Sequence, residues 1–294
     1  MKLILLLLIT TFCFSANISV VEDFNNKTYS KIYKKKRIYR QYKKRYFHKR
    51  VKRGFSKIKR AKLGTIKKGV KTYSYKQNST APKLAIIIDD ISHKYQLNLV
   101  KSLPFKVTPS IFPPNQMNKD SNNLARGLKH FMVHLPLESH SRAMNKMYKT
   151  LFTTDSNQKI LNRVAEIKRL FPNVKYINNH TGSLFTSNYQ KSKVLYKALI
   201  DNKITFIDSR TSKRSVIPKL AKEFNRRYYK NSNFIDNKIE TYAILREIKR
   251  GIKMAKLYGS AIIIGHPHLQ TFKALKMATK YLKKVNTVYI DELW

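Results

Sequence analysis

The stretch that decides the fold is KLAIIIDDISHK, residues 83–94. Its apolar run from Leu84 to Ile88 is typical of a strand that is buried on both faces, as in a parallel sheet. The run ends in two adjacent carboxylates, Asp89 and Asp90. Strand ends of this kind are common in α/β proteins, where they also provide bases and metal ligands at the mouths of barrels.

Short β-rich runs alternate with amphipathic segments from Lys83 onward. We expect strands at residues 84–89, 107–112, 131–135, 176–179, 205–208, 233–235, 261–265 and 287–290. Helices are expected within 155–171, 188–202 and 237–259, the first capped by Asp155 or Ser156 and the last ending at Gly259. The alternation predicts an α/β fold with a mainly parallel sheet or barrel.

Polar side chains occur at six of the expected strand ends. Besides the Asp pair, these ends carry His134, His180, Asp208 with Arg210, Asp236 and His266. The carboxyl ends of parallel strands share one edge, and active sites form there. Such residues also cap helices or form hydrogen bonds inside a barrel. Together, however, they favour a divalent metal with nitrogen and oxygen ligands, a carboxylate base and a His acid, and thus metal-assisted hydrolysis of an acyl bond.

The N-terminal residues predict export. Residues 1–16 have the features of a signal peptide, with Lys2 before an apolar run that is shorter than the roughly 20 residues of a membrane span. The alternative is an uncleaved anchor that reaches Val21, so we expect a periplasmic, envelope or membrane-anchored protein. Cys13 is the only cysteine. Once the signal is cleaved, disulfides and cysteine-based zinc sites are excluded, and any metal must be held by His and carboxylates.

Residues 17–82 are predicted to be a disordered basic linker. Its part 24–77 holds 22 Lys and Arg and no Asp or Glu, with Tyr residues between them. This region is either a solvated tether or a binding segment for anionic lipid surfaces or envelope polymers. Export makes nucleic acid an unlikely partner, although basic and aromatic residues together suit it. Residues 83–294 hold 38 Lys and Arg and 14 Asp and Glu, a net charge of 38 − 14 = +24. That charge suggests an anionic polymer substrate, or only a general Lys bias.

Five motifs carry a resemblance to a known family: IIDDI (87–91), VHLPLE (133–138), NNHTGSLFT (178–186), FIDSRT (206–211) and IIGHPH (263–268). Their content and order resemble the divergent polysaccharide deacetylase family, a branch of the carbohydrate esterases. The resemblance implies a distorted (β/α)7 barrel as the catalytic domain over residues 83–294.

The resemblance also implies roles for individual residues. Asp89 would be the base, Asp90 and His180 metal ligands, and His266 the general acid. Ordinary deacetylases have a second metal-binding His at the position of Leu184, so we assign the missing ligand to His134. His130 is left as a surface or wall residue, because residues four apart on a strand are separated by about 13 Å.

The remaining assignments concern the surroundings and the reaction. Arg210 would orient Asp89, while the pocket would be lined by Asn178, Asn179, Thr181, Ser183, Asp208 and Asp236, the last two as alternative partners of His266. The cofactor would be Zn²⁺, and the substrate an N-acetylated polysaccharide or peptidoglycan-type glycan. Leu184 in place of the second His, and Ile91 in place of the usual Gly, leave open the alternative of a barrel that binds a glycan without deacetylating it. A second alternative is an envelope protein that acts through its basic N-terminal region.

Overall fold

The computed structural model of the chain describes residues 81–294. The expected signal peptide, and the expected linker up to residue 80, lie outside the described residues. Within the described part, no helix combines the length and apolar character needed to cross a membrane.

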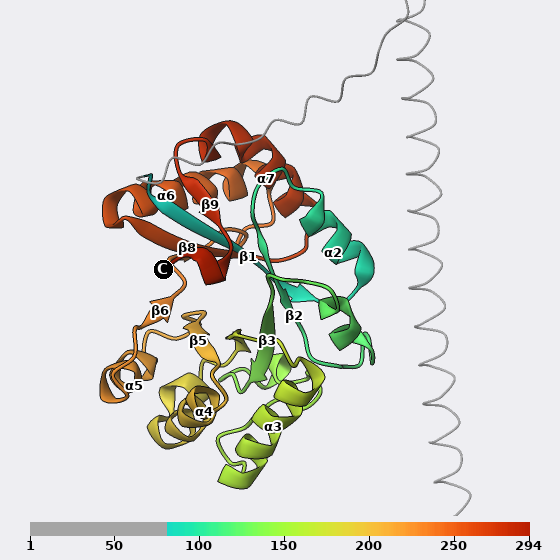
Figure 1. Ribbon diagram of the computed structural model, residues 1–294, viewed down its shortest axis with the longest axis vertical. Helices are drawn as coiled ribbons and strands as arrows, with labels where there is room; N and C mark the ends of the chain where they lie inside the picture. The colour runs from blue at the N-terminus through green and yellow to red at the C-terminus, as the bar shows by residue number, and fades with distance from the viewer. Residues whose placement is uncertain (1–80) are drawn as a thin grey trace, which may run out of the picture. The chain divides into compact units, whose positions relative to one another are not determined.

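One parallel sheet organises the described residues (Figure 1). Its strands are β1 (Lys83–Ile91), β2 (Thr108–Ile111), β3 (Met132–Leu137), β4 (Tyr176–Thr181), β5 (Thr205–Asp208), β6 (Tyr229–Lys230), β7 (Asn233–Phe234), β8 (Ser260–Gly265) and β9 (Asn286–Val288). They are ordered β6-β5-β4-β3-β2-β1-β8-β7, and β9 pairs with β1 beside this path. The all-parallel pairing agrees with the expectation from the sequence.

The two ends of the sheet are joined by a single segment, residues 229–234. The N–H of Asn231 donates to the carbonyl of Asp208 in β5 at 2.8 Å, and the N–H of Ser232 donates to the carbonyl of Ile262 in β8 at 2.8 Å. Consecutive residues therefore bond to opposite edges of the sheet. When β6 and β7 are counted as one strand position, they close a ring with β1 to β5 and β8. The ring then has seven strand positions, which confirms the distorted (β/α)7 barrel.

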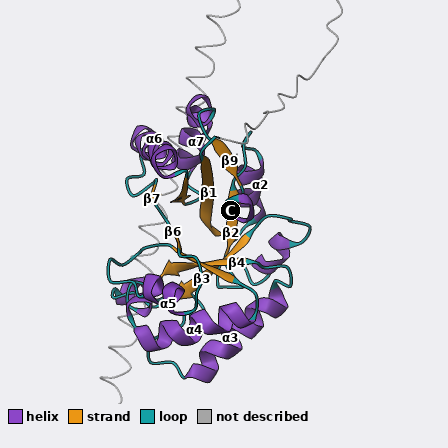
Figure 2. Ribbon diagram, turned by 60° about the vertical axis from the view of Figure 1, so that its left-hand side comes forward, coloured by secondary structure: helices purple, strands orange, loops and turns teal. Residues whose placement is uncertain are grey.

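The helices lie outside the sheet in two groups (Figures 1 and 2). They are α2 (Lys94–Lys101), α3 (Asn157–Leu170), α4 (Tyr189–Asp201), α5 (Ile217–Glu223), α6 (Thr241–Tyr258) and α7 (Leu269–Leu282), with short 3₁₀ turns η2 (Ser121–Ala125), η3 (Arg142–Met144), η4 (Phe185–Ser187) and η5 (Ile290–Glu292). Helices α6 and α7 pack against each other beside β8, whereas α3, α4 and α5 follow one another along β3 to β5.

The three helices delimited from the sequence are confirmed as α3, α4 and α6. Ser156 caps α3, since its Oγ accepts the N–H of Lys159 at 3.2 Å. Helix α6 ends at Gly259, which has a φ of 79°. Glycine adopts this left-handed conformation without steric cost, which explains the end of the helix.

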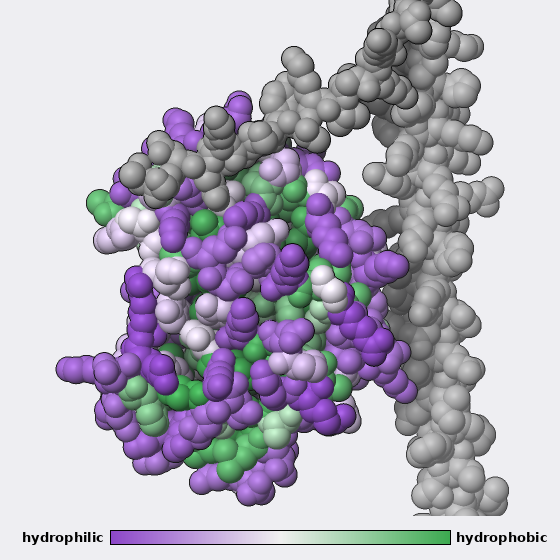
Figure 3. Space-filling model, in the orientation of Figure 1, coloured by the Kyte–Doolittle hydropathy of each residue, from purple (hydrophilic) through white to green (hydrophobic). Residues whose placement is uncertain are grey.

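Alternate residues of β1 enter two different cores, as the two-residue period of a strand requires. Ile86 and Ile88 pack toward the helices, and Ala85 and Ile87 point into the barrel. The small inner core is completed from the C-terminal segment by Val288, Ile290 and Leu293. Apolar side chains thus fill the barrel at the end opposite the carboxyl ends of its strands. Hydrophilic residues cover much of the outside (Figure 3). The carboxyl ends of the strands are left to carry the polar residues.

Candidate active site

Strand register explains why polar residues from different strands point into the barrel together. In the β3–β4 pairing, His134 is opposite Asn178 and Pro136 is opposite His180. Paired residues of parallel strands share a face, as do residues two apart on one strand. His134, Asn178 and His180 therefore all face the interior.

Asp89 and Asp90 reach the same place through an irregularity in β1. Adjacent residues of a regular strand point to opposite faces, so only one of the two would enter the barrel. The register of β1 against β2 shifts between Ile88 and Ile91, and Asp90 has a φ of 58°. Aspartate tolerates this left-handed conformation better than most residues. The bulge turns the Asp90 carboxylate toward the side that Asp89 already faces.

Three side chains converge at this point, Asp90, His134 and His180. Asp90 Oδ1 lies 3.3 Å from His134 Nε2 and 3.2 Å from His180 Nδ1. The two ring nitrogens are 3.2 Å apart. Phe112 packs against both rings. Asp90 remains 31% exposed in its side chain, so the cluster is open on one side.

The donor set fits a divalent metal. Asp90 Oδ1 is buried and accepts no hydrogen bond of good geometry. A tetrahedral ion with bonds of about 2.0–2.1 Å separates its ligand atoms by about 3.3 Å, which agrees with the three contacts. Two His and one carboxylate, with an open side, are typical ligands of a catalytic zinc ion. These residues are therefore a candidate metal site.

Asn178 connects the metal cluster to the second carboxylate. Its amide Nδ2 donates to both oxygens of Asp89, at 2.8 and 3.0 Å. Its Oδ1 therefore faces His134, whose Nδ1–H donates to it at 2.8 Å, and it also accepts the Ser110 hydroxyl at 2.7 Å. A proton on Nδ1 leaves the Nε2 lone pair of His134 free for the cluster. Asn178 thus fixes the tautomer of one ligand and the position of Asp89.

Burial and charge separate the acid strengths of the two carboxylates. Burial raises the pKa of Asp89, and the nearby His134 and His266 oppose this shift. For Asp90 burial acts in the same direction, but the close contacts with His134 and His180 outweigh it and lower its pKa. Asp90 is therefore suited to remain an anionic ligand, and Asp89 to accept a proton.

His266 faces this cluster from the end of β8, held by Asp236. Its Nδ1 lies 3.0 Å from Asp236 Oδ1, and its backbone N–H donates to Asp236 Oδ2 at 2.6 Å. Thr271 Oγ1 also donates to Oδ2, at 2.9 Å. Burial opposes protonation, but the Asp236 hydrogen bond and the charges of Asp90 and Asp236 outweigh it and raise the pKa of His266 to about 9. His266 is therefore protonated at neutral pH.

Four other expected site residues organise loops around the cluster. Asp208 accepts the Arg210 N–H and the hydroxyls of Ser215 and Tyr228. The Arg210 side chain is exposed and makes no hydrogen bond or ion pair with Asp89 among the described residues; the hydrogen-bond donor to the Asp89 carboxylate is Asn178. Further loop contacts involve Asn179, which accepts the Ser209 N–H, and Ser183, which accepts the His140 N–H.

His130 and Leu184 are the two other positions that were considered in the search for metal-binding histidines. His130 pairs with Asp291 at 2.9 Å and stacks on Tyr289, away from the metal cluster. Leu184 follows the sharp turn at Gly182, which has a φ of 88°. A Cβ on Gly182 would lie 3.0 Å from the Cβ of Leu137, so the close approach of β3 also requires glycine.

Comparisons with known proteins bear on the family and the fold of the chain. The sequence model of the family described as divergent polysaccharide deacetylase matches residues 86–294. An uncharacterized protein of Haemophilus influenzae is 30% identical over 215 residues, 72% of this chain and 76% of that protein. The uncharacterized protein YibQ of Escherichia coli is 28% identical over 201 residues, 67% of this chain and 62% of YibQ. The crystal structure of an uncharacterized protein from Agrobacterium tumefaciens has the same fold, with a TM-score of 0.65 at 16% identity over 74% of this chain and 91% of that one.

Proposed function

Because the chain belongs to the divergent polysaccharide deacetylase family, we propose that it is a metal-dependent hydrolase that removes N-acetyl or related acyl groups from an envelope polysaccharide. The observation that carries the proposal is the convergence of three metal-binding atoms, from Asp90, His134 and His180, beside a second carboxylate and a protonated His.

Asp90, His134 and His180 would hold the ion, which we assign as Zn²⁺ from its preference for nitrogen and oxygen ligands. When bound, the ion supplies Lewis acidity and makes water acidic enough to react near neutral pH. His134 is kept in the required tautomer by Asn178. The open side of the cluster gives the substrate access to the reacting atoms.

Asp89 and His266 would move the protons of the reaction. Asp89, whose pKa is raised by burial, takes a proton from the attacking water. His266 donates its proton to the nitrogen of the leaving amine, and Asp236 stabilises the imidazolium before the transfer. The amide C–N bond breaks, a C–O bond forms, and the products are a carboxylate such as acetate and an amino sugar.

We infer the location and the wider partners of the protein from its charge and its N-terminal sequence. The apolar N-terminal run supports export to the periplasm or cell envelope, where a peptidoglycan-type glycan is the substrate. A net charge of +45 favours anionic polymers and lipid surfaces as neighbours, contacted by residues 24–77.

The first experiment measures bound metal in the purified chain after zinc is supplied. The wild type and a His130→Ala control should each hold about one ion, since His130 pairs with Asp291 away from the cluster. His134→Ala and His180→Ala should lose it. A wild-type chain without metal, or an ion that survives both substitutions, would contradict the proposed site.

The second experiment measures acetate released from N-acetylated glycans by the loaded protein. Asp89→Asn should keep the metal and lose acetate release, because it removes the base and spares the three ligand residues. Glycan binding by the wild type without release of acetate would refute hydrolysis and favour the alternative of a non-catalytic binding barrel.

A further inference from the structure

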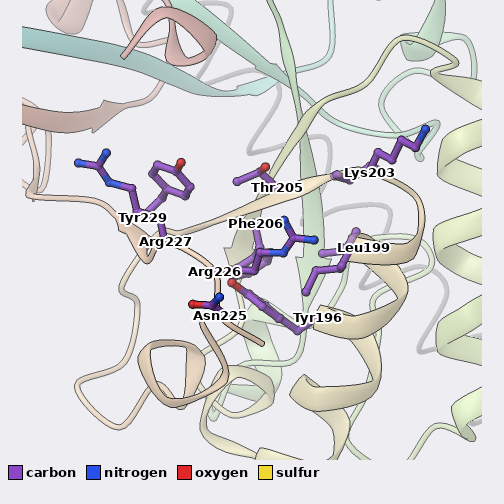
Figure 4. Close-up of a pocket in the computed structure, with 11 residues that line it drawn as sticks. Tyr196, Leu199, Lys203, Thr205, Phe206, Asn225, Arg226, Arg227 and Tyr229 are labelled. Carbon is purple, nitrogen blue, oxygen red and sulfur yellow. The ribbon is translucent and has the colours of Figure 1, made fainter. Parts of the chain in front are cut away.

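Figure 4 shows a hollow in the described part of the chain. It lies between the C-terminal half of α4, the start of β5 and the segment after α5, and has a volume of about 440 Å³. Binding sites for small molecules have volumes of about 300–1,000 Å³. Thr205 lines the hollow at the first residue of β5, whereas the metal cluster lies at the carboxyl ends of the strands. The two sites are therefore separate.

Aromatic side chains are among those that line the hollow. Tyr196 and Phe206 are 5% and 4% exposed, and their rings meet edge to face with centroids 6.5 Å apart. Tyr229 lines another side. Tyrosine combines an apolar ring with a hydroxyl, so this lining suits a ligand that has both apolar faces and hydroxyl groups.

The hollow also has positive charge without a neutralising partner. Arg226 and Arg227 line it, and no Asp or Glu does. Among the described residues, neither guanidinium forms an ion pair or hydrogen bond through its side chain. Glu223, the nearest carboxylate along the chain, pairs with Lys193 at 2.6 Å, and Asp201 at the end of α4 pairs with Lys197 at 2.7 Å.

Both arginines are positioned to donate hydrogen bonds. In Figure 4 the Arg226 guanidinium lies beside Phe206 and Tyr196. Arg227 stacks on Trp294, with its central carbon 3.4 Å from the ring centroid. Stacking occupies the face of a guanidinium and leaves the N–H groups in its plane free. Such donors match the oxygens of a phosphate or carboxylate.

We propose that this hollow binds a sugar that carries a phosphate or a carboxylate group. Arg226 is its principal anion-binding residue, and Tyr196, Phe206 and Tyr229 contact the sugar ring. Binding here requires no hydrolysis, so the proposal does not rest on the proposed enzymatic function.

The single Trp of the chain provides a local signal for the test. Trp294 is stacked on Arg227, so its fluorescence reports on the side of the hollow that Arg227 lines. The full chain is titrated with glucose 6-phosphate, glucuronate, glucose and inorganic phosphate. We expect saturable fluorescence changes with at least one anionic sugar and at least tenfold weaker binding of glucose and inorganic phosphate, because charge and ring both contribute. The tighter of the two anionic sugars identifies the group that the site recognises.

Matched variants separate a specific site from general charge attraction. Arg226→Gln should weaken binding about tenfold or more, as the loss of a charged hydrogen bond does. Arg246→Gln removes an exposed charge of α6 and should leave binding unchanged.

Three results would overturn the proposal. The first is the absence of a saturable signal with both anionic sugars. The second is unchanged binding by Arg226→Gln with a native circular dichroism spectrum. The third is equal affinity for inorganic phosphate, which would refute the role of the sugar ring.

Discussion

The interaction between Asp236 and His266 predicts a measurable link between protonation and stability. Asp236 accepts hydrogen bonds from the backbone and ring of His266 and from Thr271. Asp236→Asn keeps the shape of the side chain and removes its charge. We expect the pKa of His266 to fall from about 9 toward its ordinary value of 6.5.

The size of the effect follows from that shift. The difference between a pKa of about 9 and the ordinary 6.5, at about 1.4 kcal/mol for each pH unit, gives an upper limit of about 3.5 kcal/mol. The His266 side chain is 30% exposed, so solvent screening reduces the expected contribution to about 1–2 kcal/mol. Because the folded-state pKa is raised, this contribution is fully present below about pH 6.5 and is lost as the pH rises through about 9. The gap in unfolding free energy between wild type and Asp236→Asn should therefore be larger near pH 6 than near pH 10.

Two measurements check this reasoning. NMR of the histidine ring protons follows the titration, with His266→Gln used for assignment, and denaturant unfolding gives the stability at both pH values. Asp208→Asn is the control, because Asp208 is also buried, also accepts three hydrogen bonds and has no contact with His266. It should destabilise the fold at both pH values without moving the titration. A wild-type His266 that titrates at or below 6.5 would refute the reasoning.

Three further outcomes are expected. Zinc at 100 times its Kd should stabilise the fold by about 2.7 kcal/mol and raise the Tm by about 5–11 °C. Calorimetry with and without a chelator measures this change in Tm. An unchanged Tm would contradict a preformed site. Asn178→Ala should weaken metal affinity about 10–100-fold in a chelator competition, because His134 loses the acceptor that orients it, and unchanged affinity would contradict that role. Gly182→Ala should lower the free energy of unfolding by more than Gly127→Ala does. Both glycines have a positive φ, but of the two only Gly182 has neighbours within 4 Å of an added Cβ. Equal losses would show that backbone strain alone determines the loss of stability.

The fold was largely predictable because its signals are local. The apolar run of β1 and the helical spacing of apolar residues in α3 and α6 each extend over a short stretch of sequence. Gly259 marks a helix end by its conformational freedom. The joining of β5 to β8 by residues 229–234 was not predictable, because two-residue strands leave too few apolar positions to show a period.

The residues of the candidate site were predictable, but not their contacts. Strand ends indicated Asp89, Asp90 and His180, yet the turn at Asp90 depends on a bulge that has no sequence pattern of its own. The role of Asn178 arises from the register of β3 against β4, which a single sequence does not reveal. The repeated amide in Asn178-Asn179 was the available signal, and it was interpreted only as a pocket lining.

The position of β1 in the sheet has a consequence for how the chain reaches this fold. Ile88 pairs with Gly265 and Lys83 with Asn286, so the first strand of the barrel is completed by the last ones. The same pairings bring Asp89 next to His266. Contacts between residues so distant in sequence form slowly, because much of the chain must be ordered before they compensate for the loss of entropy. Helices can form early in refolding, whereas Asp89 and His266, the proposed base and acid, should meet late, so recovery of the site should lag behind recovery of helical structure.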